Sequence, residues 1–107
     1  MNEEDYEVAF QIIALAGESK SSSMTAIRAA KNGDFEGARA NLDAAEGNMR
    51  EAHKAHTALL AEEARGNAVP MNVILVHAQD HLTGAMLVRD LAAEFVDVHR
   101  ELKTLRG

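Results

Sequence analysis

The chain of 107 residues contains no cysteine and no tryptophan, and it has a single proline. Without thiols it can form no disulfide, no thiolate metal site and no cysteine nucleophile. Aromatic residues make up only 4% of the chain, whereas Ala, Val, Ile, Leu and Met supply most of a 47% hydrophobic fraction. This composition favours packed helices over a β-sheet and therefore predicts an all-α fold.

Positive charge is also scarce, since 11 basic residues stand against 17 acidic ones and the net charge is −6. No basic run and no pattern of basic and aromatic residues appears, so we expect no nucleic-acid partner. The N-terminal segment Met1–Asp5 is acidic where a secretory signal would be basic, and no apolar run reaches membrane-spanning length. We expect a soluble, cytoplasmic protein with a single domain over residues 1–107, because a second core would lack apolar surface.

Two segments interrupt the helical pattern, Lys31–Asp34 and Arg65–Pro70. In the first, a glycine is placed to end one helix and an aspartate to cap the next. Three helices follow, over residues 4–31, 34–65 and 70–105. At ~1.5 Å per residue each is about 40 to 55 Å long, and short connections make neighbours antiparallel. The prediction is an up-down-up three-helix bundle.

Each of the first two helices carries one apolar line. In the middle helix, residues at alternating spacings of three and four predict the buried face: Phe35, Ala38, Leu42, Ala45, Met49, Ala52, His56, Leu59 and Glu63. In the first helix the predicted line is Phe10, Ile13, Gly17, Met24 and Ile27. Ser19 and the serines at 21–23 make the middle of that helix small, which would allow close approach by another backbone.

The third helix carries two apolar lines. One comprises Ala78, Leu82, Ala85, Val88, Ala92, Phe95 and Leu102, and the other comprises Val73, Gly84, Leu87, Leu91, Val98 and Leu105. One line suffices to complete the bundle. The second predicts an interface between copies of the chain, and a homo-oligomer that closes symmetrically around this helix is the simplest form. His77 and Asp80 fall on the second line.

The titratable cluster in the third helix permits three interpretations. His77, Asp80, His81 and Gly84 lie at i, i+3, i+4 and i+7 and share a face. The imidazoles could be core groups with Asp80 as partner. The two histidines could bind zinc with Asp80, although the metalloprotease motif needs glutamate where Ala78 stands. One imidazole could be a nucleophile that carries a phosphoryl group. Spacing alone does not choose among them.

A longer sequence pattern does choose among these three interpretations. The segments Ile74–Leu82 (Ile-Leu-Val-His-Ala-Gln-Asp-His-Leu) and Val88–Phe95 closely resemble the third helix of the lactose/cellobiose-type enzyme IIA of the bacterial phosphoenolpyruvate-dependent sugar phosphotransferase system. Ile12–Ser19, Ala29–Phe35 and Glu51–Lys54 agree with the family in the same order, so the resemblance covers nearly the whole chain.

The resemblance implies a trimer of three-helix protomers, a nine-helix assembly. It implies that His77 is the phosphorylated histidine and that Asp80 meets its two symmetry mates around a structural magnesium ion. Converging carboxylates must share a proton or a cation, and a hard, oxygen-only site suits Mg²⁺.

The implied function is that of a phosphocarrier. The resemblance names HPr as phosphoryl donor and a cysteine of the cognate IIB component as acceptor, during uptake of a β-linked disaccharide of the lactose, cellobiose or chitobiose class. The carrier itself would not bind sugar, and it would meet the membrane only indirectly, through the IIC transporter.

Gln79 and His81 are candidate supports for the His77 ring. Gln79 lies about 160° around the helix from His77, which favours contact with a neighbouring helix or subunit. The residues alone also permit an alternative function. In it the chain is a non-catalytic oligomeric helical bundle, and a polar or metal-binding core sets the number of subunits.

Overall fold

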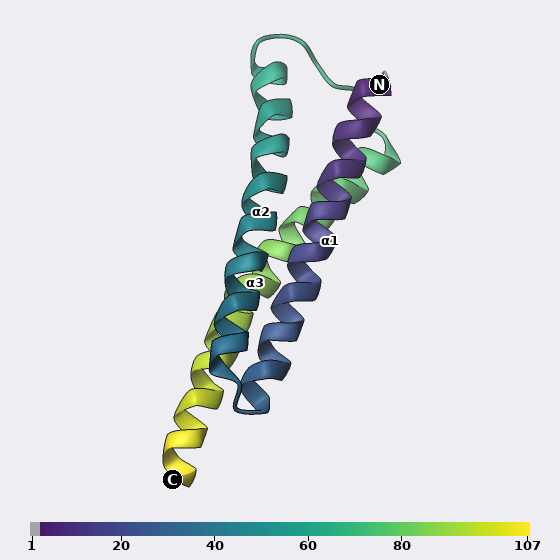
Figure 1. Cartoon of the computed structure of the whole chain (residues 1–107). Coiled ribbons are helices and arrows are strands. Elements are labelled where there is room, and N and C mark those ends of the chain that lie inside the picture. The colour runs from purple at the N-terminus through teal and green to yellow at the C-terminus, as the bar shows by residue number, and fades with distance from the viewer. Residues whose placement is uncertain (1–2) are drawn as a thin grey trace.

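The computed structural model describes residues 3–107, so the first two residues of the acidic N-terminal segment lie outside the described residues. Those described form three helices and no strand: α1 (Glu3–Lys31), α2 (Phe35–Ala64) and α3 (Val73–Arg106). Successive helices run in opposite directions, as predicted for an up-down-up bundle (Figure 1). The bundle is a rod of 59 × 21 × 19 Å. Among residues 3–107, no helix is both long and apolar enough to cross a bilayer.

The three helices do not share contact equally. α1 packs along both α2 and α3, whereas α2 and α3 touch each other much less. In Figure 1 α3 crosses the α1–α2 hairpin at an angle, and its C-terminal turns extend beyond the tight turn that joins those two helices. Much of α3 is therefore left without a covering helix from its own chain.

Capping side chains set the helix starts. The Asp34 side chain accepts a hydrogen bond from the Gly37 backbone N–H at 2.9 Å, and Gly33 before it has the left-handed φ of 83°. At α3, Asn72 accepts from the Leu75 N–H at 3.0 Å. The predicted start at residue 70 was therefore wrong by three residues, because an asparagine cap overrides the helix-initiating preference of Pro70.

The α2–α3 connection begins with side chains folded back on the helix end. Arg65 and Asn67 both donate to the Glu62 carboxylate, and Asn67 lies 3.0 Å from it. These two hydrogen bonds hold the pKa of the exposed Glu62 carboxyl below its ordinary value, and the one from Arg65 has the larger effect.

The core is built mainly from small residues. Ser19 is fully buried, and its hydroxyl donates to the Ala45 carbonyl at 2.7 Å, a contact between α1 and α2. This confirms the expected close approach at the serine-rich stretch. The buried alanines are Ala9, Ala16, Ala26, Ala30, Ala38, Ala45, Ala52, Ala78, Ala85 and Ala92, and the larger buried groups are Ile12, Leu75, Leu82 and Val96.

The buried line predicted for the first helix was wrong in register. Phe10, Gly17 and Met24 are exposed, and the buried line runs one residue to the side through Ala9, Ile12 and Ala16. Small side chains lie at the closest approach of the helices, which pushes the bulkier neighbours to the flanks. In α2 the predicted line is confirmed at its alanines, and only its last member, Glu63, is exposed.

The third helix follows the predicted division into two lines. Ala78, Leu82, Ala85 and Ala92 are buried as expected, but Phe95 is half exposed and Val96 is buried in its place. Leu102 is exposed too, because α3 outruns the hairpin. The second line is open to solvent: Val73 is 84% exposed, Leu87 60%, Leu91 48%, Val98 50% and Leu105 83%.

The alanine core makes a direct prediction for Ala45→Leu. Ala45 is fully buried against α1, so three added carbons must overpack the contact and lower the free energy of unfolding by about 1 to 3 kcal/mol. Urea titration followed by circular dichroism measures this. The matched control is Ala44→Leu, on the exposed side of the same helix turn, which should change stability by less than about 0.5 kcal/mol. Equal effects of the two variants would contradict the packing described.

Candidate functional site

His77 and Asp80 lie near the start of α3, and both are exposed. They border one open hollow of about 450 Å³, together with Val73, Val76, Gln79 and Thr83. The hollow faces away from the core, on the side of α3 where the second apolar line is uncovered. The His77 imidazole is therefore accessible to a molecule that approaches from outside the bundle.

The two histidines of the motif lie against each other. The rings of His77 and His81 have centroids 4.3 Å apart and meet edge to face at 78°. His81 is half-buried and lies on the core side of its neighbour. The prediction that these two side chains share a face is confirmed.

Asp80 is not the partner of either imidazole. Within residues 3–107, no ion pair or hydrogen bond joins its carboxylate to His77 or His81. The interpretation of these residues as a hydrogen-bonded core cluster therefore does not describe this part of the chain.

A metal site within one chain is likewise not formed. In the part of the chain that the structure describes, no three His, Cys, Asp or Glu side chains lie close enough together to hold an ion. Asp80 offers hard carboxylate oxygens on an open face, which is donor chemistry that fits magnesium. A site with three such ligands would draw them from three copies of the chain.

Gln79 contacts the neighbouring helix, as expected. Its side-chain Nε2 lies 3.2 Å from Nε2 of His56 on α2, and both side chains are half-buried. Sequence reasoning placed His56 only on the packing line of α2 and missed this link. The signal for it was a polar residue on an otherwise apolar line, opposite a glutamine of α3.

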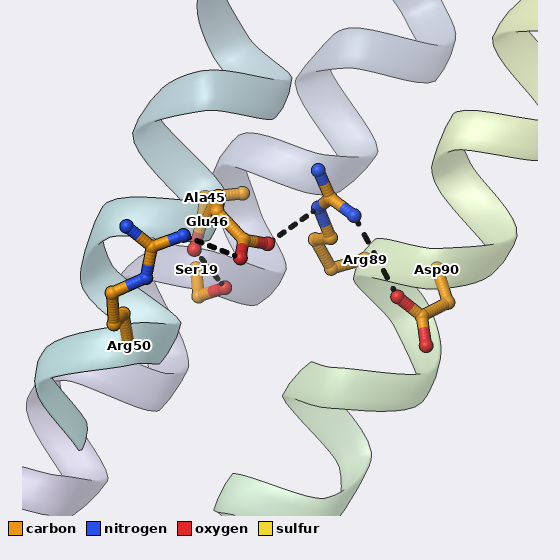
Figure 2. A network of polar contacts seen from close by, with 6 residues as sticks. All are labelled: Ser19, Ala45, Glu46, Arg50, Arg89 and Asp90. Carbon is orange, nitrogen blue, oxygen red and sulfur yellow. Dashed lines mark hydrogen bonds and ion pairs between the residues drawn. The ribbon is translucent and has the colours of Figure 1, made fainter. Parts of the chain in front are cut away.

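A second link between α2 and α3 was also missed. Figure 2 shows Glu46 of α2 between two arginines, with Arg89 Nε of α3 at 3.0 Å and Arg50 at 3.1 Å. Arg89 also reaches Asp90 at 3.7 Å. The Arg89 and Glu46 side chains are only 27% and 28% exposed, so the pair is partly shielded from water. These contacts fix α3 where its packing on α2 is sparse.

Comparison with known proteins decides the family. The sequence model described as "PTS system, Lactose/Cellobiose specific IIA subunit" matches residues 7–100. The chain belongs to this IIA family. The resemblance that the motif carried is thereby confirmed. A curated relative, the lichenan-specific phosphotransferase enzyme IIA component of Bacillus subtilis strain 168, is 45% identical over 107 residues, which are 100% of this chain and 97% of the relative.

Solved IIA structures share the fold. The cellobiose-specific enzyme IIA of Bacillus anthracis superposes with a TM-score of 0.92 at 38% identity, over 97% of this chain and 94% of that one. The IIA(Chitobiose) chain solved in complex with HPr, from the Escherichia coli diacetylchitobiose branch, superposes with a TM-score of 0.81 at 35% identity, over 96% and 99%. The three-helix bundle is thus the fold that this chain shares with these IIA structures.

The Glu46–Arg89 pair should contribute measurably to stability. Glu46→Ala leaves the partly shielded Arg89 guanidinium without its carboxylate from α2, and we expect a loss of about 1 kcal/mol in the free energy of unfolding. Asp43→Ala is the matched control on the same helix, because its pair with Arg39 is 79% and 72% exposed. That variant should cost less than about 0.5 kcal/mol. An equal loss for both in chemical denaturation would argue against the bridge.

Proposed function

We propose that this IIA protein is a cytoplasmic phosphocarrier that accepts a phosphoryl group on His77. The observation that carries the proposal is the exposed His77 ring, within the motif Val76–Leu82, at an open hollow of a chain that belongs to this family. A neutral imidazole is a competent nucleophile near pH 7. Among residues 3–107, the packing leaves the His77 side chain exposed.

Transfer of the phosphoryl group from one imidazole to the other requires no external acid or base. The Nε2 lone pair of His77 forms a bond to phosphorus while the bond between phosphorus and the donor histidine breaks. The electron pair of the broken bond returns to the donor ring, and each ring keeps its other N–H. Catalysis is then a matter of alignment in line and of stabilising the transferred charge.

HPr is the proposed donor. A solved structural relative from E. coli is a complex of a IIA chain with HPr, and that chain has the same fold as this one. The proposed acceptor is a cysteine of the cognate IIB component, and this chain, which has no cysteine, would supply only the histidine stage.

The sugar class follows from the relatives. Their names refer to lichenan, lactose, diacetylchitobiose and cellobiose. We therefore propose a role in uptake of a β-linked disaccharide or its near relative, with no binding of sugar by this chain itself and with the IIC transporter as the membrane component.

A homotrimer with nine helices is the proposed assembly. The open line of α3 is a long apolar strip, and a groove of about 330 Å³ lined by Met24, Ile27, Val88, Leu91 and Phe95 runs beside it on the α1 flank. Such a strip is unfavourable in water, and copies of the chain packed α3 to α3 would cover it.

In this proposal magnesium stabilises the trimer and takes no part in phosphoryl transfer. In a trimer centred on α3, three Asp80 carboxylates would approach one another and repel in a medium of low dielectric. A bound Mg²⁺ would neutralise that charge through oxygen ligands. Asp80 is thus proposed as a structural ligand, while His77 on the adjoining turn remains at the open hollow.

Phosphorylation is tested directly by incubating the chain with enzyme I, HPr and phosphoenolpyruvate. Mass spectrometry should detect one added phosphoryl group, labile in acid and stable in base, and His77→Ala should abolish it. His53→Ala, an exposed histidine on α2, is the control and should be phosphorylated normally. An unmodified wild type, or a His77→Ala chain that gains the same mass, would leave a non-catalytic oligomeric bundle as the better account.

Asp80→Leu tests the axial placement. Because leucine replaces converging charges by apolar contact, the variant should keep or increase trimer stability and lose any effect of a chelator such as EDTA. Sedimentation velocity with and without the chelator measures both. Monomers of Asp80→Leu under conditions where the wild type assembles would contradict the placement.

A further inference from the structure

A cluster of basic side chains lies at the end of the rod that is remote from His77. There, a pocket of about 280 Å³ is formed where the tight turn between α1 and α2 meets the last turns of α3 (Figure 1). Its lining includes Lys31, Asn32, Phe35, His99, Lys103 and Arg106, and we call it the basic pocket. None of its lining residues is acidic, although the chain as a whole has a net charge of −6.

Three cationic side chains of the basic pocket have no carboxylate partner. Among residues 3–107, no ion pair joins Lys31, Lys103 or Arg106 to an Asp or Glu side chain. The helix dipole favours a basic residue in the last turn of α1 and in that of α3, where these three lie. It does not explain why the two helix ends converge on one pocket, because like charges brought together repel.

The neighbouring carboxylates do not balance this charge. Asp34 caps α2 and accepts a hydrogen bond from the Gly37 backbone N–H at 2.9 Å. Glu101 borders a different depression of α3, together with Thr104 and Leu105. An anion from outside the chain would therefore relieve the repulsion among the three cations.

Phe35 restrains cations at the basic pocket. The guanidinium carbon of Arg100 lies 5.3 Å from the centroid of its ring, and Nζ of Lys103 lies 5.5 Å from it. Arg100 also pairs with Asp97 at 3.1 Å, whereas the Lys103 ammonium has no such partner. That ammonium lies close to the turn, because a Cβ added at Gly33 would meet it at 3.7 Å. Lys103 is thus held between α3 and the turn before any ligand arrives.

Side chains, and not the backbone, are the donors that the basic pocket offers. The backbone N–H groups of Asn32, Gly33 and Asp34 already donate to carbonyls at the end of α1. The remaining donors are the side chains of the three cations, the half-buried His99 imidazole and the Asn32 amide. Lysine supplies a point charge, and the planar fork of Arg106 matches two oxygens of a phosphate.

We propose that the basic pocket binds a phosphate monoester, carried by a small soluble molecule or by a lipid headgroup. Near pH 7 such a group has close to two negative charges and three acceptor oxygens, which suits several cations better than one carboxylate does. The volume is near the lower limit of about 300 to 1,000 Å³ for small-molecule sites, so the pocket fits a phosphate with a small organic body.

This site is separate from the proposed phosphoryl site and from the proposed trimer contact. His99 follows His77 by 22 residues, which is about 33 Å along α3 at ~1.5 Å per residue. Lys103 lies about 140° around α3 from Val98, a member of the open apolar line. Copies of the chain packed through that line would leave the basic pocket open.

The test is an NMR titration of the ¹⁵N-labelled chain with glycerol 3-phosphate at constant ionic strength, with uncharged glycerol as the control ligand. Amide signals of residues 31–35 and 99–106 should shift to saturation, and those around His77 should not. Lys31→Gln and Lys103→Gln, one on each wall, should each weaken binding about tenfold, the effect of losing one charge-assisted contact. Lys54→Gln removes the same charge from an exposed position on α2 and should stay within about twofold of the wild type.

Vesicles distinguish the two sources of the phosphate. Cosedimentation with vesicles of phosphatidylcholine and phosphatidic acid, but not with phosphatidylcholine alone, would assign the monoester to a lipid if Lys103→Gln abolishes it and Lys54→Gln does not. Saturable shifts with glycerol 3-phosphate, without such cosedimentation, would assign it to a soluble molecule. Both results support the proposal.

Three results would overturn the proposal. The first is a chain that neither shifts with glycerol 3-phosphate nor cosediments with phosphatidic acid. The second is an equal loss of binding in Lys54→Gln and Lys103→Gln, because general charge and not the pocket would then attract the anion. The third is a set of saturating shifts confined to residues outside the basic pocket. Circular dichroism of all three variants shows that they are folded, and whether HPr phosphorylates His77 does not affect the result.

Discussion

The third helix has apolar side chains around more of its circumference than two neighbours can cover, and the rest of the structure depends on this. One side of α3 completes the bundle through Ala78, Leu82 and Ala85, while Leu87 and Leu91 face outward. His77 and Asp80 lie on that outward side, near the start of the helix. The His77 imidazole, the Asp80 carboxylate and the uncovered apolar surface are therefore placed together by helical periodicity alone. The proposed trimer and the proposed phosphoryl site share one surface because they share one helix.

The packing within the three-helix bundle holds α3 in this position. Alanine and serine between α1 and α2 allow a close hairpin, and Ser19 reaches the backbone of the opposite helix. α3 packs on α1 and touches α2 less, so polar contacts hold it in place (Figure 1). The Glu46–Arg89 pair fixes the middle of α3, and His56 with Gln79 fixes its beginning beside the hollow.

The sequence sufficed for the helices, their order and the two-sided character of α3, because periodicity and turn residues are local signals. It also sufficed for the meeting of His77 with His81, since i and i+4 side chains are neighbours on any helix. The sequence misplaced the buried line of α1, where alanines pack in the core and Phe10 is exposed. Which residues are buried there depends on how closely the partner helix approaches, and a local pattern does not encode that distance. The Glu46–Arg89 and His56–Gln79 contacts join residues 43 and 23 positions apart, and no local pattern encodes such pairs.

The most direct test of this account is sedimentation equilibrium of the unmodified chain, compared with a chain that carries Leu87→Glu and Leu91→Glu. Both positions are exposed on the open side of α3 and away from the core, so the changes should leave the protomer folded. We expect the wild type to have the mass of three chains and the variant that of one, with equal helical content by circular dichroism. A monomeric wild type, or a variant that assembles as the wild type does, would contradict the claim that this side of α3 joins the copies.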